Sequence, residues 1–163
     1  MIKKDHLQKA SGYIGLGMYE DCISELEKAI ALDPRDADPF FIKAECLREL
    51  KRYKEAIAAY ERSLGLGGSV LENSVGLGWC FKRTANLDKA IETLARAIES
   101  EGEVPILCYN LACYYSLKNK ADTSLKLLER ATRLDPRFIE LAGTENDFDN
   151  IRENPGFKTL TGA

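Results

Sequence analysis

The same four residues, LDPR, occur twice in this chain, at 32–35 and again at 134–137. The offset between the two copies is 102, which is three times 34, so a shorter repeat is expected between them. Four consecutive blocks with this shorter period do align without a gap: 3–36, 37–70, 71–104 and 105–138. A repeat of this length restricts the chain to architectures that stack one small structural unit.

Small and large apolar residues recur at fixed positions of the blocks. One position is small in every block: Ala10, Ala44, Gly78 and Ala112. Three residues later the position is large: Tyr13, Leu47, Phe81 and Tyr115. Steps of three and four residues are typical of one face of a helix, and polar or glycine-containing segments interrupt them once per block. Each block therefore predicts two helices, the second of which ends before Pro34 or Pro136 in the outer blocks.

The recurring segments resemble the tetratricopeptide repeat family across 3–138. The first helices contain AECL, LGWCF and LACYY, the second helices open with YEDCI, YKEAI and LDKAI, and LDP ends the first and last blocks. The resemblance implies an all-α fold, a right-handed superhelical solenoid of antiparallel helix pairs. It also implies an adaptor in which the first helices line a concave face that accepts a peptide or helix from a partner protein.

Some positions depart from the family pattern. Lys9 and Lys43 occupy a position that is usually apolar. The second block ends in GLGGS at 65–69 rather than in proline, and the third reaches Pro105 through ESEGEVP, so the joints after these blocks are expected to be less rigid.

The final segment, 139–163, does not continue the repeated pattern and is expected to cap the last repeat. The end of a stacked array exposes an apolar face that needs a cover with a polar outer side. Five apolar residues are expected to make this contact: Ile139, Leu141, Phe148, Ile151 and Phe157.

Helix geometry predicts the residues of the concave face. In the second block Phe40, Ala44 and Leu47 are expected to face the partner helix, so the residues one step further round form the neighbouring stripe. The same step in every block gives the candidate peptide-binding residues Leu7, Ser11, Phe41, Glu45, Arg48, Val75, Trp79, Lys82, Tyr109 and Cys113.

Trp79 is the strongest of these candidates because it is the only tryptophan and follows the small Gly78. Exposed aromatic side chains in a groove are typical of binding hot spots. The alternative is that Trp79 packs against a neighbouring repeat. The corresponding positions lack the lysine and asparagine set with which some family members bind a terminal carboxylate, so that specificity is not expected. A largely apolar segment with some acidic character near Arg48 and Lys82 fits better.

Composition excludes several other functions. The chain has 163 residues, of which 45% are hydrophobic, and a net charge of −3, so it has no basic excess for nucleic acid. Its five cysteines form no CxxC pair and, with only one histidine, no Cys/His set, so no metal site is expected. No nucleophile–base set is visible either, so the chain is expected not to be an enzyme and to have no cofactor.

The chain is expected to be cytoplasmic and not inserted in a membrane. Its opening sequence, MIKKDHLQKA, lacks the apolar core of a secretory signal. The longest uncharged stretch, 104–117, is too short for a membrane-spanning helix, which needs roughly 20 residues. The partner is expected to be a protein or peptide, with a self-associating homo-oligomer or a regulatory subunit of an enzyme or secretion complex as alternatives.

Overall fold

The computed structural model describes residues 2–162, and most of them lie in helices. They form two compact units, here called the N-terminal unit, up to Ala85, and the C-terminal unit, from Asn86 onward. No strand occurs among the described residues. The boundary between the units lies in the turn between the two helices of the third sequence block, whereas the sequence pattern treats all four blocks alike.

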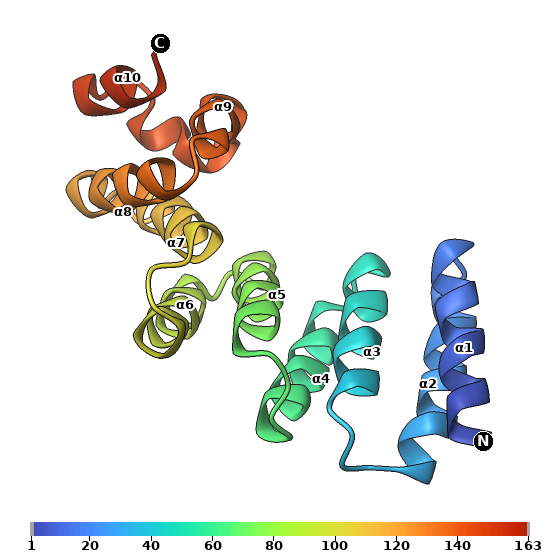
Figure 1. Ribbon diagram of the computed structural model, residues 1–163. Coiled ribbons are helices and arrows are strands. Elements are labelled where there is room, and N and C mark those ends of the chain that lie inside the picture. Colours follow the sequence, from blue (N-terminus) through green and yellow to red (C-terminus); the bar gives the residue numbers. More distant parts are fainter. Residues whose placement is uncertain (1, 163) are drawn as a thin grey trace. The chain divides into compact units, whose positions relative to one another are not determined.

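The N-terminal unit consists of two helix pairs followed by one further helix. Figure 1 shows α1 beside α2 and α3 beside α4, and α5 packs on α4. The helices are α1 (Ile2–Gly15), α2 (Tyr19–Leu32), α3 (Asp38–Glu49), α4 (Tyr53–Gly65) and α5 (Val70–Arg83).

The C-terminal unit begins with α6, which packs on α7, continues with the pair α7 and α8, and ends in shorter helices. A short 3-10 helix, η1, packs directly on α7. The helices are α6 (Leu87–Glu101), α7 (Pro105–Leu117), α8 (Ala121–Leu134), α9 (Arg137–Thr144), η1 (Asn146–Ile151) and α10 (Pro155–Thr161).

The period of the sequence is visible in where the helices begin. The second helices begin at Tyr19, Tyr53, Leu87 and Ala121, so each starts at the equivalent position of its block. Pro155, the first residue of α10, lies one more full period beyond Ala121, although the sequence pattern indicates an end of the repeat at 138. The terminal segment thus keeps the spacing of a fifth helix pair after its sequence pattern has been lost.

The turns inside the blocks share one backbone conformation. Gly17, Lys51, Ala85 and Asn119, which occupy the equivalent position of each block, all have a positive φ between 56° and 69°. In these turns the next amide donates back to the last helical turn, as from Arg52 to the Leu47 carbonyl at 2.8 Å. This left-handed cap is the common way to end a helix tightly. In the first, second and fourth blocks the second helix then packs on the first.

The small residues at the repeated position lie in the core, as predicted. Ala10, Ala44 and Ala112 are buried, and so are the small residues of the second helices, such as Ala56 and Ala90. Small side chains allow the helix axes to approach closely. A very close approach occurs at Gly76 of α5, where an added Cβ would overlap the Tyr60 ring.

The terminal segment covers α7 with aromatic side chains. The Phe148 ring meets the Tyr109 ring at 5.7 Å between centroids and the Phe157 ring at 5.5 Å, and Ile151 is also buried. The expectation for Ile139 and Leu141 is wrong, because both are exposed. The helical phase of α9 buries Phe138 and Ala142 instead, four residues apart on one face.

Candidate peptide-binding face

The N-terminal unit leaves its predicted stripe open. The eight candidate residues of this unit are half-buried or exposed: Leu7 and Ser11 on α1, Phe41, Glu45 and Arg48 on α3, and Val75, Trp79 and Lys82 on α5. Their helices are anchored through the opposite faces, where Ala10, Ala44 and Leu77 are buried. These eight side chains retain surface that another molecule can contact.

The two candidates in the C-terminal unit lie in its interior. Tyr109 is 6% exposed and Cys113 is 3% exposed. Tyr109 stacks on Phe138 at 4.7 Å between ring centroids, and the Asn150 amide donates to the Ser116 carbonyl at 3.2 Å. The terminal segment thus occupies the stripe of α7 that corresponds to the open stripe of α3. The repeat pattern places Tyr109 on this stripe, but it does not contain the non-repeated segment that covers it.

Glu45 is held by two neighbours within the N-terminal unit. The buried Tyr60 hydroxyl donates to one carboxylate oxygen, and Nη2 of Arg48 donates to the other at 2.7 Å. Burial, with the Glu45 carboxylate as the second cause, raises the pKa of Tyr60 well above its ordinary value. Both oxygens of Glu45 therefore have partners, and the one bonded to Arg48 helps to position the guanidinium at the surface.

Trp79 lies at the centre of a cluster of arginine and aromatic side chains. The Tyr53 ring meets it edge-on at 5.4 Å between centroids. The guanidinium carbons of Arg48 and Arg83 lie over the indole at 5.5 and 5.4 Å from its centroid, and that of Arg83 also lies 5.8 Å from the Tyr53 centroid. Such cation–π contacts stabilise the orientation of an arginine while its N–H groups stay able to bind anions.

Trp79 combines the two alternatives considered for it. It packs on Tyr53 of the preceding helix pair, yet it is only half-buried. Tyr53 is not among the predicted site residues, because it belongs to a second helix. The aromatic residues at the equivalent positions Tyr19 and Tyr53 are a signal in the sequence. The contact of Tyr53 with Trp79, however, depends on how α5 packs on the preceding helix pair.

A shallow pocket of about 330 Å³ adjoins this cluster and shares Tyr53 with it. It lies between the start of α4 and the end of α5, and its other lining residues are Lys51, Arg52, Lys54, Glu55 and Thr84. Three of these six side chains are cationic and one is anionic. The pocket and the cluster together give this end of α5 a positive charge.

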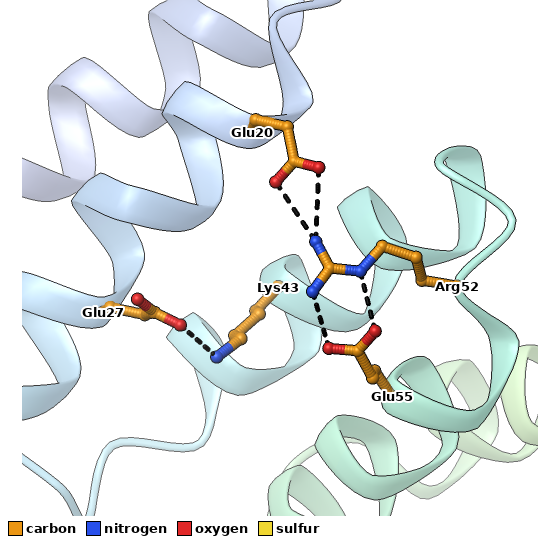
Figure 2. Close-up of polar contacts among 5 residues, drawn as sticks. All are labelled: Glu20, Glu27, Lys43, Arg52 and Glu55. Carbon is orange, nitrogen blue, oxygen red and sulfur yellow. Dashed lines mark hydrogen bonds and ion pairs between the residues drawn. The ribbon is translucent and has the colours of Figure 1, made fainter.

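Ion pairs join the first helix pair to the second (Figure 2). Arg52, which precedes α4, donates from Nε and Nη2 to Glu55 in the first turn of α4 and from Nη1 to Glu20 on α2. Nζ of Lys43 reaches Glu27 at 2.7 Å. The Arg52 guanidinium lowers the pKa of Glu55. Exposed pairs contribute little stability individually. The Glu27 contact does explain why a lysine is accommodated at position 43, where the family pattern has an apolar residue.

The cysteines offer no reactive site. All five are buried. Burial raises the pKa of Cys80 to about 11 and also raises the pKa of Cys22, whose sulfur lies 3.2 Å from that of Cys46. Within residues 2–162 no three metal-ligating side chains gather at one point. In the same part of the chain no helix has the length and apolar character needed to cross a bilayer.

Helix pairs repeated at one constant spacing define an α-helical repeat protein of the kind that presents an extended binding surface. Three tetratricopeptide repeat models match the chain, at residues 7–69, 73–101 and 106–138. The chain belongs to the tetratricopeptide repeat family, and the predicted all-α repeat fold is confirmed.

Solved structures share this fold at low sequence identity. A MamA fragment from Desulfovibrio magneticus RS-1 is 18% identical, with a TM-score of 0.82 over 98% of this chain and 89% of that one. PilF of Pseudomonas aeruginosa is 18% identical, with a TM-score of 0.78 over 99% and 75%. YrrB, described as a TPR protein with an unusual peptide-binding site, is 16% identical, with a TM-score of 0.73 over 96% and 85%.

A match among curated proteins is confined to one part of the chain. The human zinc finger CCCH domain-containing protein 7B is 37% identical over 62 residues, which are 38% of this chain and 6% of that protein. The matched segment spans only 6% of the length of that protein.

Proposed function

We propose that this protein is an interaction module whose N-terminal unit binds a peptide or helix of a partner protein along α1, α3 and α5. One observation carries the proposal: the predicted stripe is open in the N-terminal unit, whereas the equivalent stripe of α7 is filled by the chain's own terminal segment. The stripe of α7, which has the same helical register, thus already packs a short segment of this protein. In this proposal 3–138 provide four repeats and 139–163 the cap.

The family supports a role in protein binding. Tetratricopeptide repeat proteins are generally scaffolds for interaction rather than enzymes, and YrrB is described as having a peptide-binding site. We propose that this chain acts without catalysis and without nucleic acid as a partner, and that it works in the cytoplasm. The stripe offers aromatic and aliphatic contacts at Phe41, Val75 and Trp79, with charged groups at its edge, as peptide grooves commonly do.

The test compares two phenylalanines of one helix. Phe41 lies on the proposed face, against the Tyr60 ring at 6.0 Å between centroids, whereas Phe40 lies under the guanidinium of Arg62, whose central carbon is 5.6 Å from the ring centroid. Both rings are half-buried, so their replacements by alanine are matched in size and exposure. Peptides selected on the full chain from a random display library serve as ligands, and their affinities are measured by titration calorimetry.

We expect Phe41→Ala and Trp79→Ala to weaken binding of the selected peptides by about 1–2 kcal/mol or more. Phe40→Ala should leave their affinity unchanged. If all three variants bind equally well, the ligand lies elsewhere on the molecule. If the library yields no ligand at all, the proposal of a peptide-binding face fails.

Self-association is a second candidate, favoured by exposed apolar side chains on the first helix pair. Ile2, Leu16, Met18 and Leu32 are exposed, Leu16 to 73%. Such residues are a common feature of surfaces that meet another copy or another protein. Mass measured in solution at several concentrations, for the natural chain and for Leu16→Ser, separates a homo-oligomer from a monomer that binds other proteins. A regulatory subunit of an enzyme or secretion complex would be recognised by identifying its partner.

A further inference from the structure

Three cations around Trp79 form no ion pair within residues 2–162. Arg83 is exposed, its guanidinium lies over Trp79 and Tyr53, and no carboxylate of the described residues pairs with it. Lys51 and Lys54, in the adjoining pocket, are likewise exposed and form no ion pair within residues 2–162. These three residues, together with Tyr53 and Trp79, are called the Trp79 patch below.

The carboxylates around the patch are already engaged. Glu49, two residues before Lys51, accepts a hydrogen bond from Nη2 of Arg48 at 3.3 Å. Glu45 is bonded to Tyr60 and Arg48, and Glu55 is bonded to Arg52. The patch therefore has a local excess of positive charge on a chain whose net charge is −3. An arginine oriented by two aromatic rings is well suited to bind a carboxylate with two parallel hydrogen bonds.

The C-terminal unit shows what kind of segment such a stripe packs. The residues of η1, which lie on α7, have the sequence NDFDNI. Phe148 is completely buried against Tyr109, while Asp149 beside it is exposed. The stripe of a first helix can therefore pack an aromatic side chain that has a carboxylate residue on either side of it in sequence.

We propose that the Trp79 patch and the neighbouring stripe bind a segment of a partner protein in which an aromatic residue lies close in sequence to a carboxylate. The inference rests on the proposed function and specifies the chemistry of the ligand. The aromatic ring packs on Phe41 and Val75, and the carboxylate accepts hydrogen bonds from the Arg83 guanidinium.

Helix geometry sets the spacing within this ligand. Val75 and Arg83 lie eight positions apart on α5, which corresponds to about 12 Å along the helix axis. An extended chain covers this distance in roughly four residues. The ligand is therefore an aromatic residue with an acidic residue about three to five positions before or after it, as Glu145 and Glu153 lie around Phe148.

The experiment uses three synthetic peptides and the full chain. The first peptide has the sequence of 144–153, TENDFDNIRE. The second replaces its phenylalanine by alanine, and the third replaces its aspartates and glutamates by asparagine and glutamine. Binding of each fluorescent peptide is measured by anisotropy at about 0.05 M and about 0.5 M salt, because exposed charges are screened at the higher concentration.

We expect the first peptide to bind, the other two to bind at least tenfold more weakly, and salt to weaken the first. Arg83→Gln should weaken the first peptide about 10- to 100-fold, because hydrogen bonds to a charged group are lost. Arg62→Gln is the matched control, since Arg62 also lies over an aromatic ring, Phe40, but on another face. Its affinity should equal that of the natural chain, and melting curves verify that both variants are folded.

The contrary outcomes are distinct. If the third peptide binds as well as the first, or if Arg83→Gln has no effect, the acidic–aromatic ligand is wrong. The proposed function would still hold if library peptides lost affinity on Trp79→Ala, and it would fail with the inference if no peptide bound at all. Concentration-dependent dimers that Arg83→Gln abolishes would assign the patch to a second copy of this chain and overturn the choice of a partner protein.

Discussion

The stripe of α3 and the stripe of α7 have the same helical register but different surroundings. On α3, Phe41 keeps part of its ring in contact with water, and Arg48 is half-buried. On α7 the equivalent Tyr109 is enclosed by Phe138 and Phe148, and the Ser116 carbonyl accepts a bond from Asn150. The repeat therefore specifies where a face points, whereas residues outside the repeat decide whether the face is available.

The largest expected effect comes from removing the ring that closes the stripe of α7. Phe148→Ala should destabilise the C-terminal unit by about 3–5 kcal/mol, because a fully buried ring leaves a cavity. Phe41→Ala should cost about 1 kcal/mol, because that ring is only half-buried. Denaturant unfolding of both variants measures the difference. Equal losses would contradict the distinction between an open and a closed stripe.

A smaller effect is expected where α5 crosses Tyr60. Gly76→Ala should destabilise the N-terminal unit by roughly 1–3 kcal/mol, since the new methyl group would overlap the buried Tyr60 ring. Gly12→Ala on α1 is the control, because no atom lies within 4 Å of its added Cβ. That change should stabilise α1 by about 0.5–1 kcal/mol through helix propensity. Stabilisation by both changes would show that α5 is not this close to α4.

The period of the helices could be read from the sequence, but the contacts between successive pairs could not. The small residues Ala44 and Ala112 and the proline stops are repeated, so they indicate where each helix lies. Trp79 meets Tyr53 and Arg48 only because α5 packs on the preceding helix pair, and no single block contains that information. The burial of Tyr109 depends on Phe148, which lies beyond the last repeated block.

Acidic pH should affect the first helix pair through Glu25. Hydrogen bonds from Lys28 and His6 lower the pKa of Glu25 to about 2 from its ordinary 4.5. A group with a lowered pKa in the folded state contributes stability above its unfolded value, and this contribution is lost as the pH falls from 4.5 towards 2. Unfolding at several pH values should show a weaker loss of stability over this window for Glu25→Gln than for the natural chain. An identical pH profile would mean that these hydrogen bonds do not persist in solution.

The smallest expected effect compares equivalent turns of the two units. Lys51 and Asn119 both have a positive φ, 59° and 56°, at the same position of their blocks. This conformation costs a side chain with a Cβ about 1 kcal/mol or more, but asparagine tolerates it better than lysine because its short amide can bond locally. Lys51→Gly should therefore stabilise the protein by about 0.5–1 kcal/mol, while Asn119→Gly should change the unfolding free energy by only a few tenths. Denaturant midpoints at constant slope provide the comparison. A gain at Asn119 as large as the gain at Lys51 would show that the positive φ strains asparagine as much as lysine.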